Sequence, residues 1–120
     1  MARIVVVEDD PNVSRLYETE LRADGHVVSL VDNGRDAVTR VMEVRPDVVV
    51  MDIRLPRMDG IEAMWRILSE DKSIAVIINT AYREYQANFM TWGAEAYVLK
   101  GPDVEPLKEA IRAVLARRQA

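Results

Sequence analysis

The chain has 120 residues, no cysteine and a formal net charge of −4 from 16 basic and 20 acidic side chains. Without cysteine, a disulfide framework and a thiolate metal site are excluded, and the negative balance argues against a surface that neutralises nucleic-acid phosphates. No apolar run approaches the roughly 18 residues of a membrane helix, and nothing at Met1 resembles a signal peptide, so we expect one cytoplasmic domain over residues 1–120 with no direct contact with nucleic acid or membrane.

Short β-branched runs alternate along the chain with longer segments in which apolar residues recur every three or four positions. This alternation predicts strands and helices in turn. In chain order, we expect a strand at 3–7, a helix at 11–23, a strand at 27–31, a helix at 34–44, a strand at 47–51, a helix at 60–68, a strand at 74–79, a helix at about 82–91, a strand at 95–99 and a helix at 103–118.

Residues typical of helix starts and ends support these boundaries. Asp10 before Pro11 is typical of a helix N-cap followed by a first helical proline, while Gly25 and Pro46 stand where the first two helices have to end. The strand at 48–51 is apolar on both faces, which favours a parallel sheet covered by helices on each side. The predicted fold class is therefore α/β and doubly wound.

Charged and polar side chains follow the ends of four predicted strands. Glu8 and Asp9 follow the first strand, Asp52 the third, Thr80 the fourth and Lys100 the fifth. In an open parallel sheet, ligands bind beyond the carboxyl ends of the strands, where adjacent connections depart to opposite faces. Clustered carboxylates repel one another, and a bound metal would relieve the repulsion. The pattern therefore predicts a functional site at this edge.

Five short motifs stand in order along the chain: Val7 to Pro11, Val50 to Pro56, Met58 to Gly60, Asn79 to Ala81 and Tyr97 to Lys100. Each motif alone is weak, but their order and separation are specific. Together they resemble the receiver domain of two-component response regulators, of the chemotaxis-Y type, over nearly the whole chain. The resemblance implies a flavodoxin-like fold, with a five-stranded parallel sheet in the order 2-1-3-4-5 and five helices.

The same resemblance assigns a phosphoacceptor and a metal site. It implies that Asp52 accepts a phosphoryl group, and that Asp9, assisted by Glu8, binds Mg²⁺ together with Asp52 and the backbone carbonyl of Arg54. Magnesium suits such a site because it takes one or two carboxylates and keeps several waters. A divalent cation would also offset the repulsion between the Asp52 carboxylate and an anionic phosphoryl group.

The resemblance further implies that Thr80 hydrogen-bonds the phosphoryl oxygens and that Lys100 pairs with the phosphate. Movement of Thr80 would let Tyr97 turn inward and change the surface of the fourth and fifth helices. The implied donor is a histidine kinase or histidine phosphotransfer protein. The altered surface would bind an unidentified downstream protein, or the domain would pass the phosphoryl group on. Dimerisation that depends on phosphorylation is a further possibility. We expect a signalling receiver that catalyses only its own phosphorylation and dephosphorylation.

The chain departs from the family pattern at three positions. Gly101 separates Lys100 from Pro102, and we expect a trans peptide bond between Lys100 and Gly101 because a cis bond there would cost about 2.5 to 4 kcal/mol. Arg54 and Tyr82 are bulky residues at places that flank the phosphoryl group in this family. We therefore predict slow access of water and a long-lived phosphoryl-aspartate.

Three other functions remain as alternatives. An aspartate-nucleophile phosphatase would carry a second acid two positions past its nucleophile. This chain has Arg54 there, which argues against the phosphatase. A phosphate-independent interaction module would not need the set Asp9, Asp52, Thr80 and Lys100. A dinucleotide-binding domain is disfavoured because no glycine-rich turn follows the first strand.

Overall fold

Five parallel strands form one sheet in the computed structural model, which describes residues 2–119. The spatial order is β2-β1-β3-β4-β5, so the predicted order is confirmed. The strand bounds are β1 Arg3–Val7, β2 Val27–Val31, β3 Val48–Met51, β4 Ala75–Thr80 and β5 Ala96–Leu99.

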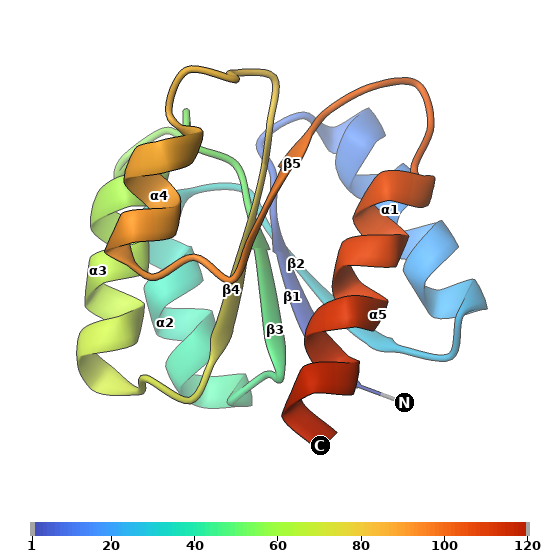
Figure 1. Ribbon diagram of the computed structural model, residues 1–120, viewed down its shortest axis with the longest axis horizontal. Helices are drawn as coiled ribbons and strands as arrows, with labels where there is room; N and C mark the ends of the chain where they lie inside the picture. Colours follow the sequence, from blue (N-terminus) through green and yellow to red (C-terminus); the bar gives the residue numbers. More distant parts are fainter. Residues whose placement is uncertain (1, 120) are drawn as a thin grey trace.

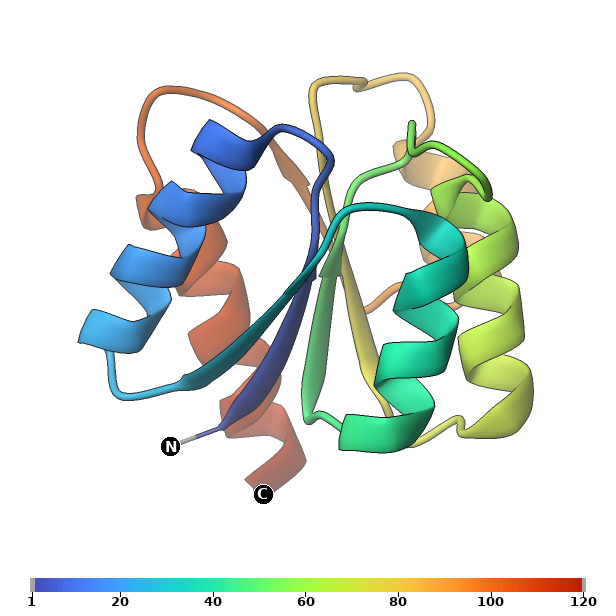
Figure 2. The ribbon, with the colours of Figure 1, turned by 180° about the vertical axis from the view of Figure 1, so that it is seen from behind.

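Helices cover both faces of the sheet, as the doubly wound prediction requires. Two of them, α1 and α5, lie on one face, and the other three lie on the opposite face (Figures 1 and 2). Among the described residues, none of the helices combines the length and apolar character needed to cross a membrane. The helix bounds are α1 Pro11–Ala23, α2 Gly34–Val44, α3 Gly60–Glu70, α4 Gln86–Trp92 and α5 Glu105–Gln119.

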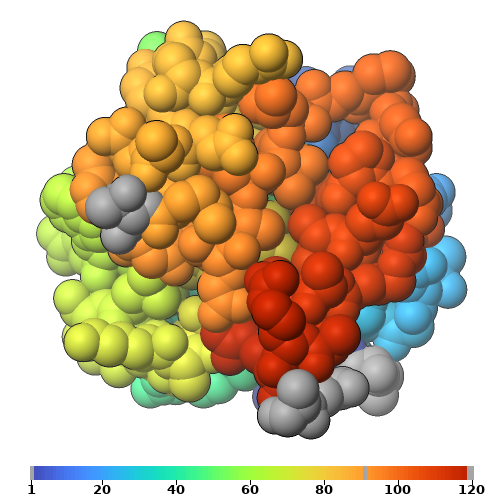
Figure 3. All heavy atoms as spheres, in the orientation of Figure 1, coloured from blue at the N-terminus to red at the C-terminus, as the bar shows by residue number. Residues whose placement is uncertain are grey.

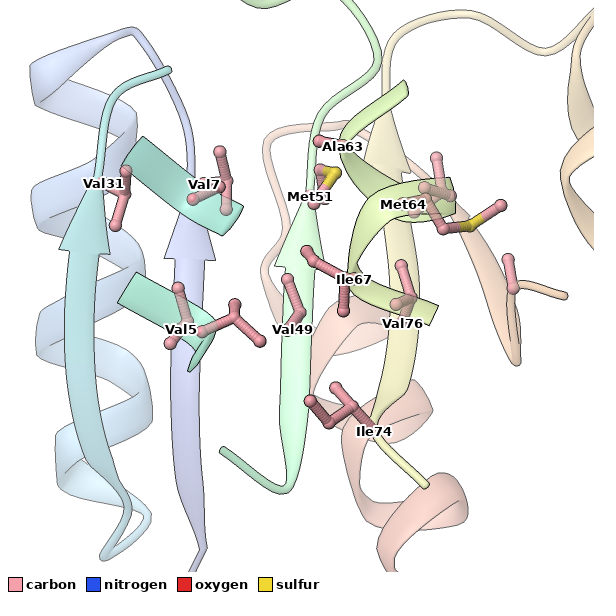
Figure 4. Close-up of a cluster of buried hydrophobic side chains, with 14 of the residues drawn as sticks. Val5, Val7, Val31, Val49, Met51, Ala63, Met64, Ile67, Ile74 and Val76 are labelled. Atoms are coloured by element: carbon pink, nitrogen blue, oxygen red, sulfur yellow. The ribbon is translucent and has the colours of Figure 1, made fainter. Parts of the chain in front are cut away.

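Each face of the sheet has its own apolar core. Successive residues of a strand point to opposite faces, so Val5 and Val7 pack towards α2, α3 and α4 while Ile4 and Val6 pack towards α1 and α5. Burial on both faces explains why these strands read as continuous apolar runs. Figure 4 shows the first of these cores, in which α3 contributes Ala63, Met64 and Ile67.

The two central strands bring the acidic residues to one edge. Val7 of β1 pairs with Met51 of β3, so the residues that follow these strands leave the sheet at the same level. The chain then turns into α1 on one face after β1, and into α3 on the other face after β3 (Figure 1). The ends of β1 and β3 thus form the switch point at which sheets of this kind bind ligands.

The predicted helix starts were wrong in the C-terminal half. Helix α4 begins at Gln86 rather than near Tyr82. The preceding segment forms a turn in which the Gln86 N–H donates to the carbonyl of Arg83, while the carbonyl of Tyr82 accepts a hydrogen bond from the Tyr97 hydroxyl. Helix α5 begins at Glu105, since Asp103 precedes the helix and accepts a hydrogen bond from the Glu105 N–H. Most other bounds agree within one residue, although α3 continues two residues further than predicted.

Candidate functional site

Three carboxylates converge at the switch point. Glu8 and Asp9 follow β1 and Asp52 follows β3, and one oxygen from each lies within 4.8 Å of the other two. Glu8 and Asp52 are buried, whereas Asp9 is exposed and can meet an incoming ligand. Hard oxygen donors at this separation fit a magnesium ion, which needs few protein ligands and retains water. The predicted convergence of these acids is confirmed by the geometry.

Lys100 supplies a cation to the same cluster. Its Nζ lies 2.5 Å from Glu8 Oε1 and 2.6 Å from Asp52 Oδ2. Lys100 follows β5, and its backbone N–H donates to the carbonyl of Thr80, which holds the start of the connection beside β4. All described peptide bonds are trans, so the expected trans bond between Lys100 and Gly101 is confirmed.

Burial and charge shift the protonation of this cluster. Burial raises the pKa of Glu8 above its usual range, although the Lys100 ammonium and the N–H of Asp10 partly offset the shift. Burial by itself would lower the pKa of Lys100, but its hydrogen bonds to Asp52 and Glu8 raise that pKa above the ordinary lysine value. Lys100 is therefore a firmly charged counter-ion for the buried acids.

The end of β4 lies between the ends of β3 and β5 and carries two buried polar residues. Thr80 is fully buried, and its Oγ1 accepts the N–H of Tyr82 at 3.4 Å. Asn79 points to the other face, where its Nδ2 donates to the Tyr17 hydroxyl of α1 at 2.9 Å. This link between α1 and β4 was not predicted, and the one signal for it was an asparagine in an otherwise apolar strand.

The loops that follow β3 and β4 contact each other. The guanidinium carbon of Arg54 lies 4.6 Å from the centroid of the Tyr82 ring, a cation–π contact between the loops after β3 and β4. The carbonyl of Tyr82 accepts the hydroxyl of Tyr97, whose side chain is half-buried. Sequence analysis named these three residues separately, but it did not predict that they touch.

The loop after β3 packs closely against the start of α3. A Cβ atom on Gly60 would lie 2.3 Å from the backbone oxygen of Asp52, far inside van der Waals contact. The N–H of Gly60 donates to the carbonyl of Ile53 at 2.8 Å, and the side chain of Asp59 caps α3. Gly60 therefore lets α3 approach the backbone of Asp52.

The family model of the response regulator receiver domain matches residues 4–112. The chain belongs to this family. Its five-stranded parallel sheet in the order 2-1-3-4-5 is that of a receiver domain, as the resemblance implied.

Curated relatives of this receiver domain include longer proteins. Regulatory protein AtoC of Escherichia coli K12 is 36% identical over 115 residues, which make up 94% of this chain and 25% of AtoC. The DNA-binding response regulator MtrA of Mycolicibacterium smegmatis is 34% identical over 119 residues, or 98% of this chain and 52% of MtrA. The receiver domain therefore spans a quarter of one relative and about half of the other.

Solved structures include similar receiver folds. Response regulator TrrA from Thermotoga maritima, in complex with Mg²⁺ and BeF, superposes with a TM-score of 0.89 at 32% identity, covering 95% of this chain and 99% of that chain. TrrA in complex with the histidine kinase ThkA gives a TM-score of 0.87 at 33% identity, with coverages of 96% and 99%. These ligands and partners are those of TrrA.

Proposed function

We propose that this receiver domain accepts a phosphoryl group on Asp52 from a phosphohistidine of a histidine kinase or phosphotransfer protein, with Mg²⁺ held by Glu8, Asp9, Asp52 and the carbonyl of Arg54. The observation that carries the proposal is the convergence of three carboxylates with Lys100 at the switch point of the sheet. The complexes of TrrA with Mg²⁺ and BeF and with a histidine kinase support the same assignment.

Asp52 is held in a fixed orientation before a donor arrives. Its Oδ2 accepts a hydrogen bond from Lys100 Nζ, and its Oδ1 accepts a hydrogen bond from the N–H of Ile53 at 2.8 Å. In the transfer, a carboxylate oxygen of Asp52 bonds to phosphorus while the bond from phosphorus to the donor imidazole nitrogen breaks, and that nitrogen keeps the electron pair. A preorganised nucleophile reduces the entropy lost in reaching this geometry.

Positive charge offsets the repulsion between the two anionic reactants. A Mg²⁺ ion held by the carboxylates would supply part of this charge. Lys100 supplies a second, flexible cation on the β5 side, and it already lies within hydrogen-bond distance of Asp52. The added phosphoryl charge gives Lys100 a better partner than the bare carboxylates.

The response of the domain passes through Thr80 and Tyr97. Thr80 stands at the end of β4, between the strands that carry Asp52 and Lys100, so its hydroxyl is the donor we assign to a phosphoryl oxygen. A change at Thr80 reaches Tyr97 through Tyr82, which contacts both residues. The altered surface near α4 and α5 then binds a downstream protein or a second copy of the chain, or passes the phosphoryl group on.

Intact-protein mass spectrometry after incubation with acetyl phosphate tests the proposal. Wild type should gain the mass of one phosphoryl group when Mg²⁺ is present and none when it is chelated. Asp52→Asn should gain none, whereas Asp59→Asn, a nearby exposed acid whose capping role asparagine can keep, should behave as wild type. An unmodified wild type would contradict the proposal and favour a phosphate-independent interaction module.

A further inference from the structure

One buried hydrogen bond joins α1 to β4. The Nδ2 of Asn79 donates to the Tyr17 hydroxyl at 2.9 Å, and the two residues are only 3% and 7% exposed. Tyr17 belongs to the core that α1 and α5 share with the sheet. In the space-filling view, α5, in red, covers much of this side of the molecule, and α1, in blue, shows at its margin (Figure 3). The bond is therefore shielded from water, where an unpaired partner is most unfavourable.

Tyr17 lies within electrostatic reach of the candidate site. Burial raises the pKa of Tyr17, and the hydrogen bond from Asn79 and the positive charge of Lys100 partly offset this shift. The negative charges of Glu8 and Asp52 raise the same pKa further. The Tyr17 hydroxyl therefore stays neutral at physiological pH and keeps its hydrogen bond.

Asn79 stands where β4 leaves its ladder with β3. That ladder ends at Ile78, whereas the ladder between β4 and β5 continues to Thr80. We call residues 79–80 the overhang. On the β5 side, the N–H of Lys100 donates to the Thr80 carbonyl at 2.8 Å. The side chain of Asn79 adds a second hold on the overhang, from α1.

The overhang carries the hydroxyl that we assign to a phosphoryl oxygen. Thr80 directly follows Asn79, and the two side chains point to opposite faces of the sheet because successive strand residues alternate. Thr80 Oγ1 accepts the N–H of Tyr82 at 3.4 Å, which leaves the hydroxyl hydrogen for another acceptor. A bond that fixes the backbone at Asn79 therefore also fixes the place of the Thr80 hydroxyl.

We propose that Tyr17 and Asn79 are a positioning pair: their bond holds the overhang against α1, so that the Thr80 hydroxyl meets an incoming phosphoryl group without further ordering of the backbone. This inference rests on the proposed function, in which Thr80 binds a phosphoryl oxygen. A segment that is ordered before its ligand arrives loses less conformational entropy on binding. The pair acts through Thr80 and does not itself contact the phosphoryl group.

The affinity for beryllofluoride, which forms a complex with Mg²⁺ and TrrA, measures this ordering. Fluorine NMR of the bound group at saturating Mg²⁺ gives the affinity. Tyr17→Phe removes one hydroxyl, and we expect it to bind beryllofluoride about three- to tenfold more weakly than wild type. The affinity for Mg²⁺ alone should be unchanged, because the residues assigned to the ion lie outside β4. Tyr85→Phe removes a hydroxyl on the opposite face of the sheet, and this matched control should bind as wild type does.

Replacing both partners separates positioning from stability. Tyr17→Phe leaves a buried amide without its partner and Asn79→Leu leaves a buried hydroxyl, so each variant should unfold at lower urea concentration than wild type. The double variant should recover much of this stability, because apolar groups of similar size replace both partners. It should still bind beryllofluoride weakly, because the hydrogen bond that orders the overhang is gone. Recovery of the affinity together with the stability would overturn the inference.

A Thr80→Val background tests whether the pair acts through the Thr80 hydroxyl. In that background, Tyr17→Phe should cause no further loss of affinity for beryllofluoride. An equal loss in both backgrounds would overturn the inference. Should Asn79→Leu fail to fold, Tyr17→Phe, Thr80→Val and their double variant carry the test.

The two proposals fail in different ways. A wild-type protein that binds no beryllofluoride in the presence of Mg²⁺ contradicts the proposed function, and this inference with it. A wild-type protein that binds beryllofluoride, with an affinity that Tyr17→Phe leaves unchanged or increases, overturns the positioning role alone.

Discussion

The ammonium group of Lys100 lies 2.6 Å from Oδ2 of Asp52, although β3 and β5, which these two residues follow, are not neighbours in the sheet. The long lysine side chain crosses the end of β4 to reach the acid. It also contacts Glu8, so a single cation offsets part of the negative charge of two buried carboxylates. A metal ion entering the site therefore meets acids that already have a partner.

Replacing Lys100 should destabilise the protein in a magnesium-dependent way. Lys100→Met leaves two buried acids without their cation, and we expect a loss on the order of 3 kcal/mol in the free energy of unfolding. Added Mg²⁺ should recover part of this loss, because an ion that binds only the folded state stabilises it. Urea unfolding with and without Mg²⁺ measures both effects. Lys72→Met, at an exposed lysine, is the control, and an equal response in the two variants would contradict the account.

Adding a methyl group at Gly60 should disturb the acceptor loop. The new Cβ of Gly60→Ala would lie 2.3 Å from the backbone oxygen of Asp52 and 3.0 Å from Cα of Ile53. We expect a cost of about 2 kcal/mol in unfolding free energy from this overpacking, together with slower phosphorylation by acetyl phosphate. Gly101→Ala meets no atom within 4 Å and is the matched control. Equal stability of the two variants would show that the loop moves freely.

His26 should make the protein sensitive to acid. Burial lowers the pKa of His26, against the opposing charge of Asp24, and its Nδ1 accepts the N–H of Ala2. In the unfolded chain the His26 imidazole becomes protonated near a pH of about 6.5, whereas in the folded chain it becomes protonated only at lower pH. The stability that the neutral, buried His26 contributes is therefore fully present above the unfolded-state pKa, and it is lost as the pH falls through the folded-state pKa.

The difference between wild type and His26→Gln isolates this effect from other titrating groups. Unfolding free energies measured in urea at about pH 7.5 and about pH 5.5 should fall more for wild type than for the variant. Parallel changes in the two proteins would refute the role of His26.

Much of the site could be predicted because the carboxyl ends of parallel strands share one edge. Acids at the ends of two apolar runs and a lysine at the end of a third were enough to predict that Glu8, Asp52 and Lys100 meet. The order of the strands in the sheet could not be predicted in this way, because periodicity carries no information on which strands are neighbours. That order came from the resemblance to receiver domains.

The contacts around Tyr82 could not be predicted, because they are made between side chains and backbone distant in sequence. The pattern at 82–91 favoured a helix, but the helix starts four residues later, and the Tyr82 carbonyl accepts the hydroxyl of Tyr97 instead of a helical N–H. The N-cap position, Tyr85, makes no side-chain capping bond that could have marked the start. The bond between Asn79 and Tyr17 likewise joins residues 62 positions apart and has no local signature.

Trapping of the modified aspartate tests the central claim most directly. Protein treated with acetyl phosphate and Mg²⁺ is reduced with borohydride, which converts an acyl phosphate into homoserine, and is then cleaved after arginine. The account predicts homoserine at position 52, in the peptide covering residues 41–54, because the bond between Arg45 and Pro46 resists cleavage. It predicts no conversion at Asp9 or Asp59. Conversion at either of those residues with Asp52 unmodified would contradict it.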